Sequence, residues 1–130
     1  MAETDLELEV DAVAGVLVVA ARGTMVRGGL EHLRRCLTQA IDAGRPVVLD
    51  LREVDALDAD GCALLREAHA RLATRLRVVM ERGGSVHLAL KDAGLAHTLA
   101  LHGSVATALT AATPLAPTGR FARADARLSP

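Results

Sequence analysis

Polar and hydrophobic residues alternate at the start of the chain, and a continuous apolar run follows them. Leu6, Leu8 and Val10 alternate with acidic residues, which is the period of a strand with one buried face. A turn is expected at residues 14 and 15, and the apolar run 16–21 predicts a second strand that is buried on both faces. The two segments together predict an N-terminal β-hairpin.

The next apolar positions recur every three or four residues and therefore predict an amphipathic helix. These positions are Leu30, Leu33, Leu37 and Ile41. Gly44 and Pro46 are typical of the end of such a helix. The short apolar run 47–51 is typical of a central parallel strand, and a loop is expected over residues 52–57.

A second amphipathic helix is predicted to begin at Asp58, and it is long for a chain of this size. Gly83 and Gly84 would end it. Its apolar positions are Leu65, Ala68, Leu72, Leu76 and Val79. Its exposed side is rich in arginine and offers a contact for an acidic partner; these residues are Arg66, Arg71, Arg75, Arg77 and Arg82.

Three further elements complete the predicted domain. Residues 85–90 alternate as in a strand, residues 93–101 predict a short helix, and residues 104–112 predict a last helix with Ser104 as its cap. The resulting order β-β-α-β-α-β-α-α predicts one α/β domain over residues 1–112. The proline, glycine and arginine residues of 113–130 predict a flexible C-terminal tail.

The composition argues against nucleic acid and membrane as partners. Hydrophobic residues make up 51% of the 130 residues, yet Trp and Tyr are absent, so stacked bases would find no aromatic platform in the domain. The 15 basic and 16 acidic residues give a net charge of −1, which attracts neither nucleic acid nor an anionic membrane. The longest apolar run is too short to cross a bilayer, and the acidic N-terminus does not resemble a signal peptide. We therefore expect a cytoplasmic protein that does not insert into membranes.

The sequence predicts no catalytic, cofactor or metal site. Cys36 and Cys62 lack metal-ligand spacing and are expected to be buried free thiols. His97 and His102 are five residues apart and would not share a helical face. No serine or threonine has a base at a readable spacing, and neither a P-loop nor a Gly-x-Gly-x-x-Gly motif is present. The protein is therefore expected not to be an enzyme.

The segment Asp58-Ala59-Asp60-Gly61 has the residues of a helix start. The Asp58 carboxylate is suited to cap the first free N–H groups, and Asp60 would lie in the first turn, where the helix dipole favours negative charge. Gly61 would let another surface approach the backbone closely.

This segment and its surroundings resemble the signature of the STAS family, whose best-known bacterial members are anti-sigma-factor antagonists. The pattern is the strand Val-Val-Leu-Asp-Leu at 47–51, then Leu57-Asp58-x-x-Gly61, then Ala-Leu-Leu at 63–65. The resemblance extends over residues 6–112. It implies a mixed β-sheet with the N-terminal hairpin and with helices packed mainly on one face.

The resemblance also implies a function, which is partner switching in the regulation of transcription. Antagonists of this family bind an anti-sigma factor, often one with a serine-kinase fold, which phosphorylates the first Ser of the motif and releases the antagonist. The expected partner-binding loop and helix comprise Asp58, Ala59, Asp60, Gly61, Cys62, Leu65 and Arg66. Ala59 stands at the position of the phosphorylated Ser and has no hydroxyl, so no phosphorylation is expected there. Two outcomes stay open: the domain binds its partner without being switched off at this site, or Asp60 acts as a weak, permanent mimic of the phosphorylated state.

Two alternatives stay open at this point. The chain could be the STAS subunit of an ABC-type membrane transport system, in which the same loop and helix would dock on the ATPase. A homodimer is also compatible with the resemblance, because isolated domains of the family occur as monomers and as dimers.

Overall fold

The alternating N-terminal segment and the apolar run after it form the expected hairpin. In the computed structural model, which describes residues 6–25 and 29–112, strands β1 (Leu6–Val13) and β2 (Val16–Met25) pair antiparallel. The turn between them has a positive φ at both positions, 53° at Ala14 and 83° at Gly15. Two positive φ values suit the right-handed twist of a two-residue hairpin. The predicted hairpin is confirmed.

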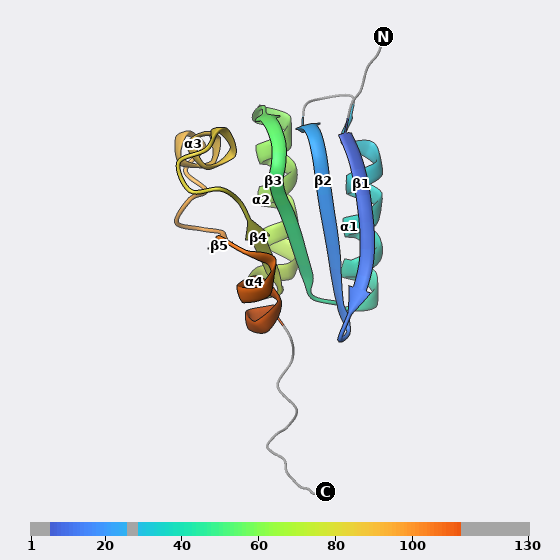
Figure 1. The fold of residues 1–130 in the computed structure, drawn as a ribbon. Coiled ribbons are helices and arrows are strands. Elements are labelled where there is room, and N and C mark those ends of the chain that lie inside the picture. Colours follow the sequence, from blue (N-terminus) through green and yellow to red (C-terminus); the bar gives the residue numbers. More distant parts are fainter. Residues whose placement is uncertain (1–5, 26–28, 113–130) are drawn as a thin grey trace, which may run out of the picture.

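The remaining strands join the hairpin by parallel pairing, and the sheet has the order β1-β2-β3-β4-β5 (Figure 1). These strands are β3 (Val47–Leu57), β4 (Leu76–Val79) and β5 (Ala100–His102). The helices are α1 (Glu31–Ala43), α2 (Ala59–Leu72), α3 (Ser85–Asp92) and α4 (Val105–Ala112), and a 3₁₀ turn, η1 (Ala73–Arg75), follows α2. Because one antiparallel pair joins three parallel ones, the predicted mixed sheet is confirmed.

The helices lie mainly on one side of the sheet, as expected. Figure 1 shows α1 and α2 behind the sheet and α4 in front of it. The larger core cluster lies between the rear face of the sheet and the helices α1, α2 and α3. Each helix contributes buried side chains to it, for example Leu37, Leu65 and Leu90. A smaller cluster under α4 contains Val16, Val48, Val79, Ala108 and Ala112.

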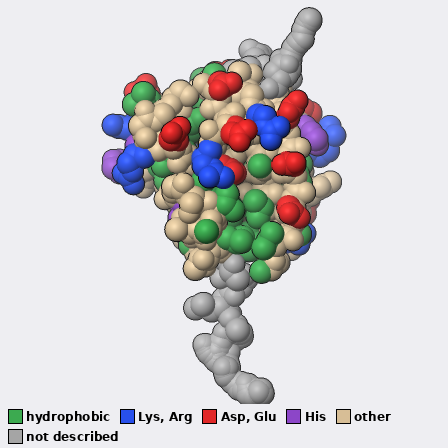
Figure 2. Space-filling view, viewed as in Figure 1, with side chains coloured by type: hydrophobic (Ala, Val, Ile, Leu, Met, Phe, Trp, Pro, Cys, Tyr) green, Lys and Arg blue, Asp and Glu red, His purple; other side chains and the backbone are tan. Residues whose placement is uncertain are grey.

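The rest of the front face is open and carries charge, as Figure 2 shows. On β2, Val16 and Val19 are buried, but Val18 and Ala20 are only half-buried, because α4 covers the front face at one end only. The expectation that this strand is buried on both faces is therefore correct only in part. Farther along β2, the exposed Arg22 guanidinium reaches Glu7 on β1 at 3.4 Å and Glu53 on β3 at 2.9 Å. Such exposed pairs contribute little stability, and they keep this face hydrated.

The predicted long helix is wrong beyond Leu72. The apolar positions Leu72 and Leu76 continue a helical period, but Ala73 adopts φ 51° and ψ −124°, which ends α2. The chain then makes the turn η1 and enters β4, where Leu76 and Val78 alternate into the larger core. The loop expected over 52–57 is also wrong, because β3 continues through it.

Two later predictions have the wrong element type as well. Residues 85–90 belong to helix α3, in which Val86 and Leu90 are buried one turn apart and Leu88 is 52% exposed. The helix expected over 93–101 is a set of turns that leads into β5. The observed order of elements is therefore β-β-α-β-α-β-α-β-α. Only the last helix of this region agrees with its prediction. The tail predicted over 113–130 lies outside the described residues.

Candidate functional site

Helix α2 begins as its sequence predicts, with Asp58 as the N-cap. Asp58 has extended backbone angles, and its Oδ1 accepts a hydrogen bond of 2.9 Å from the N–H of Gly61. Asp60 lies exposed in the first turn. Both carboxylates are therefore placed where a helix N-terminus stabilises negative charge.

Gly61 is required by a contact inside the protein. A Cβ on this residue would lie 2.6 Å from the carbonyl oxygen of Met25 at the end of β2 and 2.5 Å from Cδ1 of Leu57. The same Met25 carbonyl accepts a hydrogen bond of 3.2 Å from the N–H of Asp58. The close approach expected at Gly61 is thus made by strand β2 of the protein itself. The start of α2 packs directly against the end of this strand.

The seven residues expected to form the partner-binding loop and helix divide into an exposed and a buried set. Gly61, Cys62 and Leu65 are buried, and Leu65 has no exposed surface at all. Asp58 is half-buried, and the exposed residues are Ala59, Asp60 and Arg66. The surface that this segment can offer to another protein therefore consists of Asp58, Ala59, Asp60 and Arg66, which we call the α2 surface.

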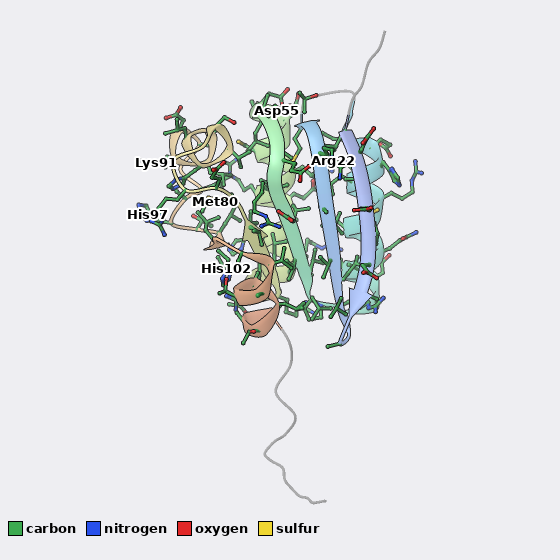
Figure 3. All side chains as sticks on the ribbon, in the orientation of Figure 1. Arg22, Asp55, Met80, Lys91, His97 and His102 are labelled. Atoms are coloured by element: carbon green, nitrogen blue, oxygen red, sulfur yellow. The ribbon has the colours of Figure 1, made fainter. Side chains whose placement is uncertain are left out.

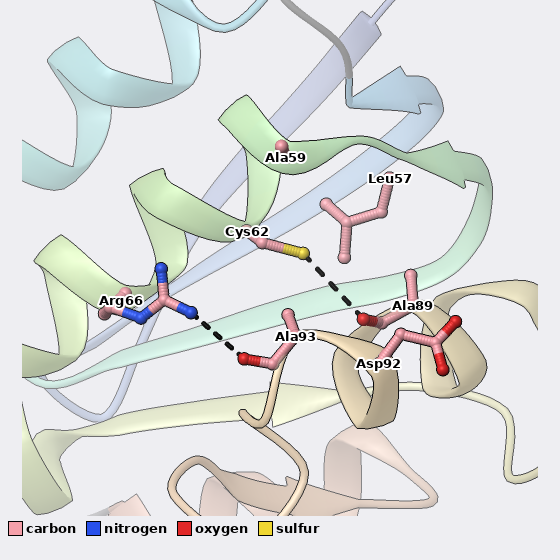
Figure 4. A pocket seen from close by; sticks show the side chains of 7 residues that line it. All are labelled: Leu57, Ala59, Cys62, Arg66, Ala89, Asp92 and Ala93. Atoms are coloured by element: carbon pink, nitrogen blue, oxygen red, sulfur yellow. Dashed lines mark hydrogen bonds between the residues drawn. The ribbon is translucent and has the colours of Figure 1, made fainter.

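A cavity of about 350 Å³ opens beside the α2 surface, between α2 and α3 (Figure 4). Its lining consists of Leu57, Ala59, Cys62, Arg66, Ala89, Asp92 and Ala93. Arg66 spans the gap, because its Nη2 donates a hydrogen bond of 3.1 Å to the carbonyl oxygen of Ala93. We call this hollow the α2–α3 cavity. Its walls are apolar, and a guanidinium and a carboxylate lie at its edge, which is a combination suited to an amphipathic side chain.

The Cys62 thiol faces the α2–α3 cavity without being a reactive group. Its Sγ lies 4.0 Å from the carbonyl oxygen of Ala89. Burial raises the pKa of Cys62, the nearby Arg66 lowers it, and Asp58 raises it, with a net upward shift. The thiol is therefore protonated at neutral pH and is a poor nucleophile.

The part of the cavity that α3 contributes was missed by the sequence analysis. Ala89 was assigned to a strand and Ala93 to a later helix, and Asp92 fell between the two, so nothing placed these residues opposite α2. The spacing of Val86 and Leu90, four residues apart, was the available signal for α3.

The expected arginine-rich face does not exist as one surface. Arg66 and Arg71 lie on α2, but Arg77 is half-buried in β4, and Arg82 follows that strand. Arg75 lies in η1, where its Nη1 donates to the carbonyl oxygen of Gly44 at 3.2 Å. These side chains point to different parts of the molecule because the predicted helix ends at Leu72.

Within the described residues, no group of three or more His, Cys, Asp or Glu side chains is placed to hold a metal ion. In the same part of the chain, no helix is both long and apolar enough to cross a membrane.

Comparison with known proteins identifies the family. The model of the STAS domain matches residues 7–108, which include every strand and helix except the last residues of α4 and the first of β1. The chain belongs to the STAS domain family. A search of curated proteins finds no match.

Several solved structures share this STAS fold. An anti-sigma factor antagonist from Mycobacterium paratuberculosis superposes with a TM-score of 0.75 at 24% identity, over 84% of this chain and 95% of that one. The phosphorylated form of SpoIIAA, a Bacillus cell fate determinant, gives 0.60 at 15% identity, over 80% and 97%. An anti-sigma-factor antagonist (STAS) domain protein from Planctomyces limnophilus gives 0.63 at 16% identity, over 81% and 96%. At these identities the likeness establishes the fold.

The close packing at Gly61 yields a stability prediction. Gly61→Ala should lower the free energy of unfolding by about 2 kcal/mol, because the new Cβ meets a backbone oxygen that cannot move aside cheaply. Gly103→Ala is the matched control, since nothing lies within 4 Å of its added Cβ, and its effect should stay within about 0.5 kcal/mol. Urea denaturation measures both variants. If Gly61→Ala were as stable as Gly103→Ala, the start of α2 would not pack closely against the end of β2.

Proposed function

We propose that this STAS domain is a regulatory interaction module of the anti-sigma-factor antagonist type, which acts in the cytoplasm by partner switching and catalyses no reaction. Its partner is an anti-sigma factor with a serine-kinase fold. The observation that carries the proposal is the α2 surface, a capped helix start that is exposed at the motif position of the family and adjoins the α2–α3 cavity.

The chemistry of this site suits docking. Protein interfaces are anchored by a few side chains that enter pockets, surrounded by a polar rim. The α2–α3 cavity can receive one short apolar side chain, while Asp60 and Asp92 offer carboxylates to a cationic neighbour. Cys62 and Leu65 are buried in the core, and their packing holds α2 in position under the exposed residues.

We further propose that binding at this site is not switched off by phosphorylation of residue 59. Ala59 is exposed at the start of α2, where a hydroxyl would be accessible, but its methyl group accepts no phosphoryl group. Asp60 is a poor substitute, because consecutive helical residues point about 100° apart around the helix axis. Its single carboxylate therefore does not occupy the direction of a phosphate on residue 59, and it has fewer acceptor oxygens.

This reasoning predicts the effect of removing the Asp60 charge. Asp60→Ser should leave the affinity for the anti-sigma factor within about threefold of wild type, the effect of a rim residue. Arg66→Ala, which removes the side chain that spans the α2–α3 cavity, should weaken binding by about tenfold or more. Isothermal titration calorimetry measures both. A tenfold gain on Asp60→Ser would instead identify Asp60 as a mimic of the phosphorylated state.

A second prediction concerns the missing hydroxyl. Ala59→Ser should make the domain a substrate of its kinase-like partner, so that the complex dissociates after Mg²⁺ and ATP are added, whereas the wild-type complex persists. Ala63→Ser is the matched control, because residue 63 is exposed one turn farther along α2 and should gain no phosphate. Phosphate incorporation and complex dissociation are read by mass spectrometry and gel filtration. Release of the wild-type protein by ATP alone would contradict the proposal.

A further inference from the structure

A second cavity lies on the other side of α3 and has no part in the proposed docking site. It measures about 490 Å³, and its lining comes from three segments: the residues directly after β4, helix α3, and the turns before β5 together with β5 itself. Ala89 and Asp92 of α3 line the α2–α3 cavity, whereas His87 and Lys91 of the same helix line this one. We call it the basic cavity.

The basic cavity has an unbalanced set of charges. Its polar lining consists of Arg82, His87, Lys91 and His97, and no carboxylate lines it. Among the described residues, Arg82 and Lys91 form no salt bridge, although other arginines of the chain do. Figure 2 shows Lys, Arg and His side chains gathered at the left edge of the molecule, and Figure 3 places Lys91 and His97 at that edge near Met80. Cations that converge on a cavity without a counter-charge attract anions.

One of these groups is held in place by the backbone. Nδ1 of His87 accepts a hydrogen bond of 2.8 Å from the N–H of Gly83, in the turn before α3. In the neutral ring this acceptor role leaves Nε2 as the donor. Together with the guanidinium of Arg82 and the ammonium of Lys91, the site therefore offers hydrogen-bond donors from different segments.

The floor of the basic cavity is apolar. Met80 is 3% exposed and Leu99 is 5% exposed, and both belong to the larger core as well as to the cavity lining. Ala96 and Leu101 also line the cavity and are only half-buried, so a ligand over them removes apolar surface from water while its charged end meets the basic side chains. The volume lies in the range of cavities that hold small organic molecules.

We propose that the basic cavity binds a small organic phosphate, with the phosphoryl group between Arg82 and Lys91 and the apolar part over Ala96 and Leu101. A phosphoryl group fits better than a carboxylate, because it has three terminal oxygens and up to two negative charges for the donors that converge there. The site is independent of the proposed partner docking.

The first test is an NMR titration of the full chain, labelled with ¹⁵N, using phenyl phosphate, inorganic phosphate and phenol in separate experiments. Phenyl phosphate should cause saturable shifts of amides in the basic cavity. Inorganic phosphate should shift the same amides with an affinity lower by about tenfold, because it lacks the apolar contact. Phenol should cause no saturable shift. Shifts by phenyl phosphate that do not saturate, or that spread over arginines all around the surface, would overturn the proposal.

The second test uses variants of equal charge change. The double variant Arg82→Gln/Lys91→Gln should weaken phenyl phosphate binding by about tenfold or more, because two charge-assisted contacts are lost. The control Arg35→Gln/Arg71→Gln removes two exposed arginines elsewhere and should leave the affinity within about twofold. Equal weakening by both variants would show a general charge effect and would also overturn the proposal. Because no partner protein is present, either result leaves the proposed docking function unaffected.

Discussion

The packing at the start of α2 determines what the rest of this domain can present to another protein. Asp58 caps the helix through the N–H of Gly61, and its own N–H bonds to the carbonyl of Met25. Gly61 lets that carbonyl lie closer than any side chain would allow. These contacts connect the ends of β2 and β3 to α2, and the helix cap alone is worth about 1 kcal/mol. With the backbone fixed in this way, Ala59 and Asp60 must face the solvent.

The same constraint divides the residues of the motif into those that hold the junction and those that remain exposed. Asp58 and Gly61 serve the junction of sheet and helix, so they would be needed whether or not a partner binds. Ala59, Asp60 and Arg66 are exposed and are not needed for the contact between α2 and the end of the sheet. The fold therefore does not depend on which exposed residue stands at position 59.

The sequence predicted the elements whose signals are local. The hairpin, α1 and the capped start of α2 each have a clear period or a cap residue within a few positions. The elements after Leu72 were predicted wrongly because their signals depend on the fold. Ala73 ends α2 at φ 51°, although alanine is the best helix former. Val86, Leu88 and Leu90 alternate as in a strand, but Val86 and Leu90 also fit a helical spacing, and the exposure of Leu88 in the folded protein shows that the segment is a helix. Both cavities use α3, so neither could be predicted without it.

The central claim is that the α2 surface captures an anti-sigma factor with a serine-kinase fold. The most direct measurement is affinity capture from the native cell with wild type and with the charge-reversed variant Asp60→Lys/Arg66→Glu, followed by mass spectrometry of the bound proteins. Both substitutions lie at exposed positions, so the variant should fold like wild type. We predict that wild type captures such an anti-sigma factor and that the variant does not. Capture of a transporter ATPase instead, or of the same anti-sigma factor by both proteins, would contradict the account.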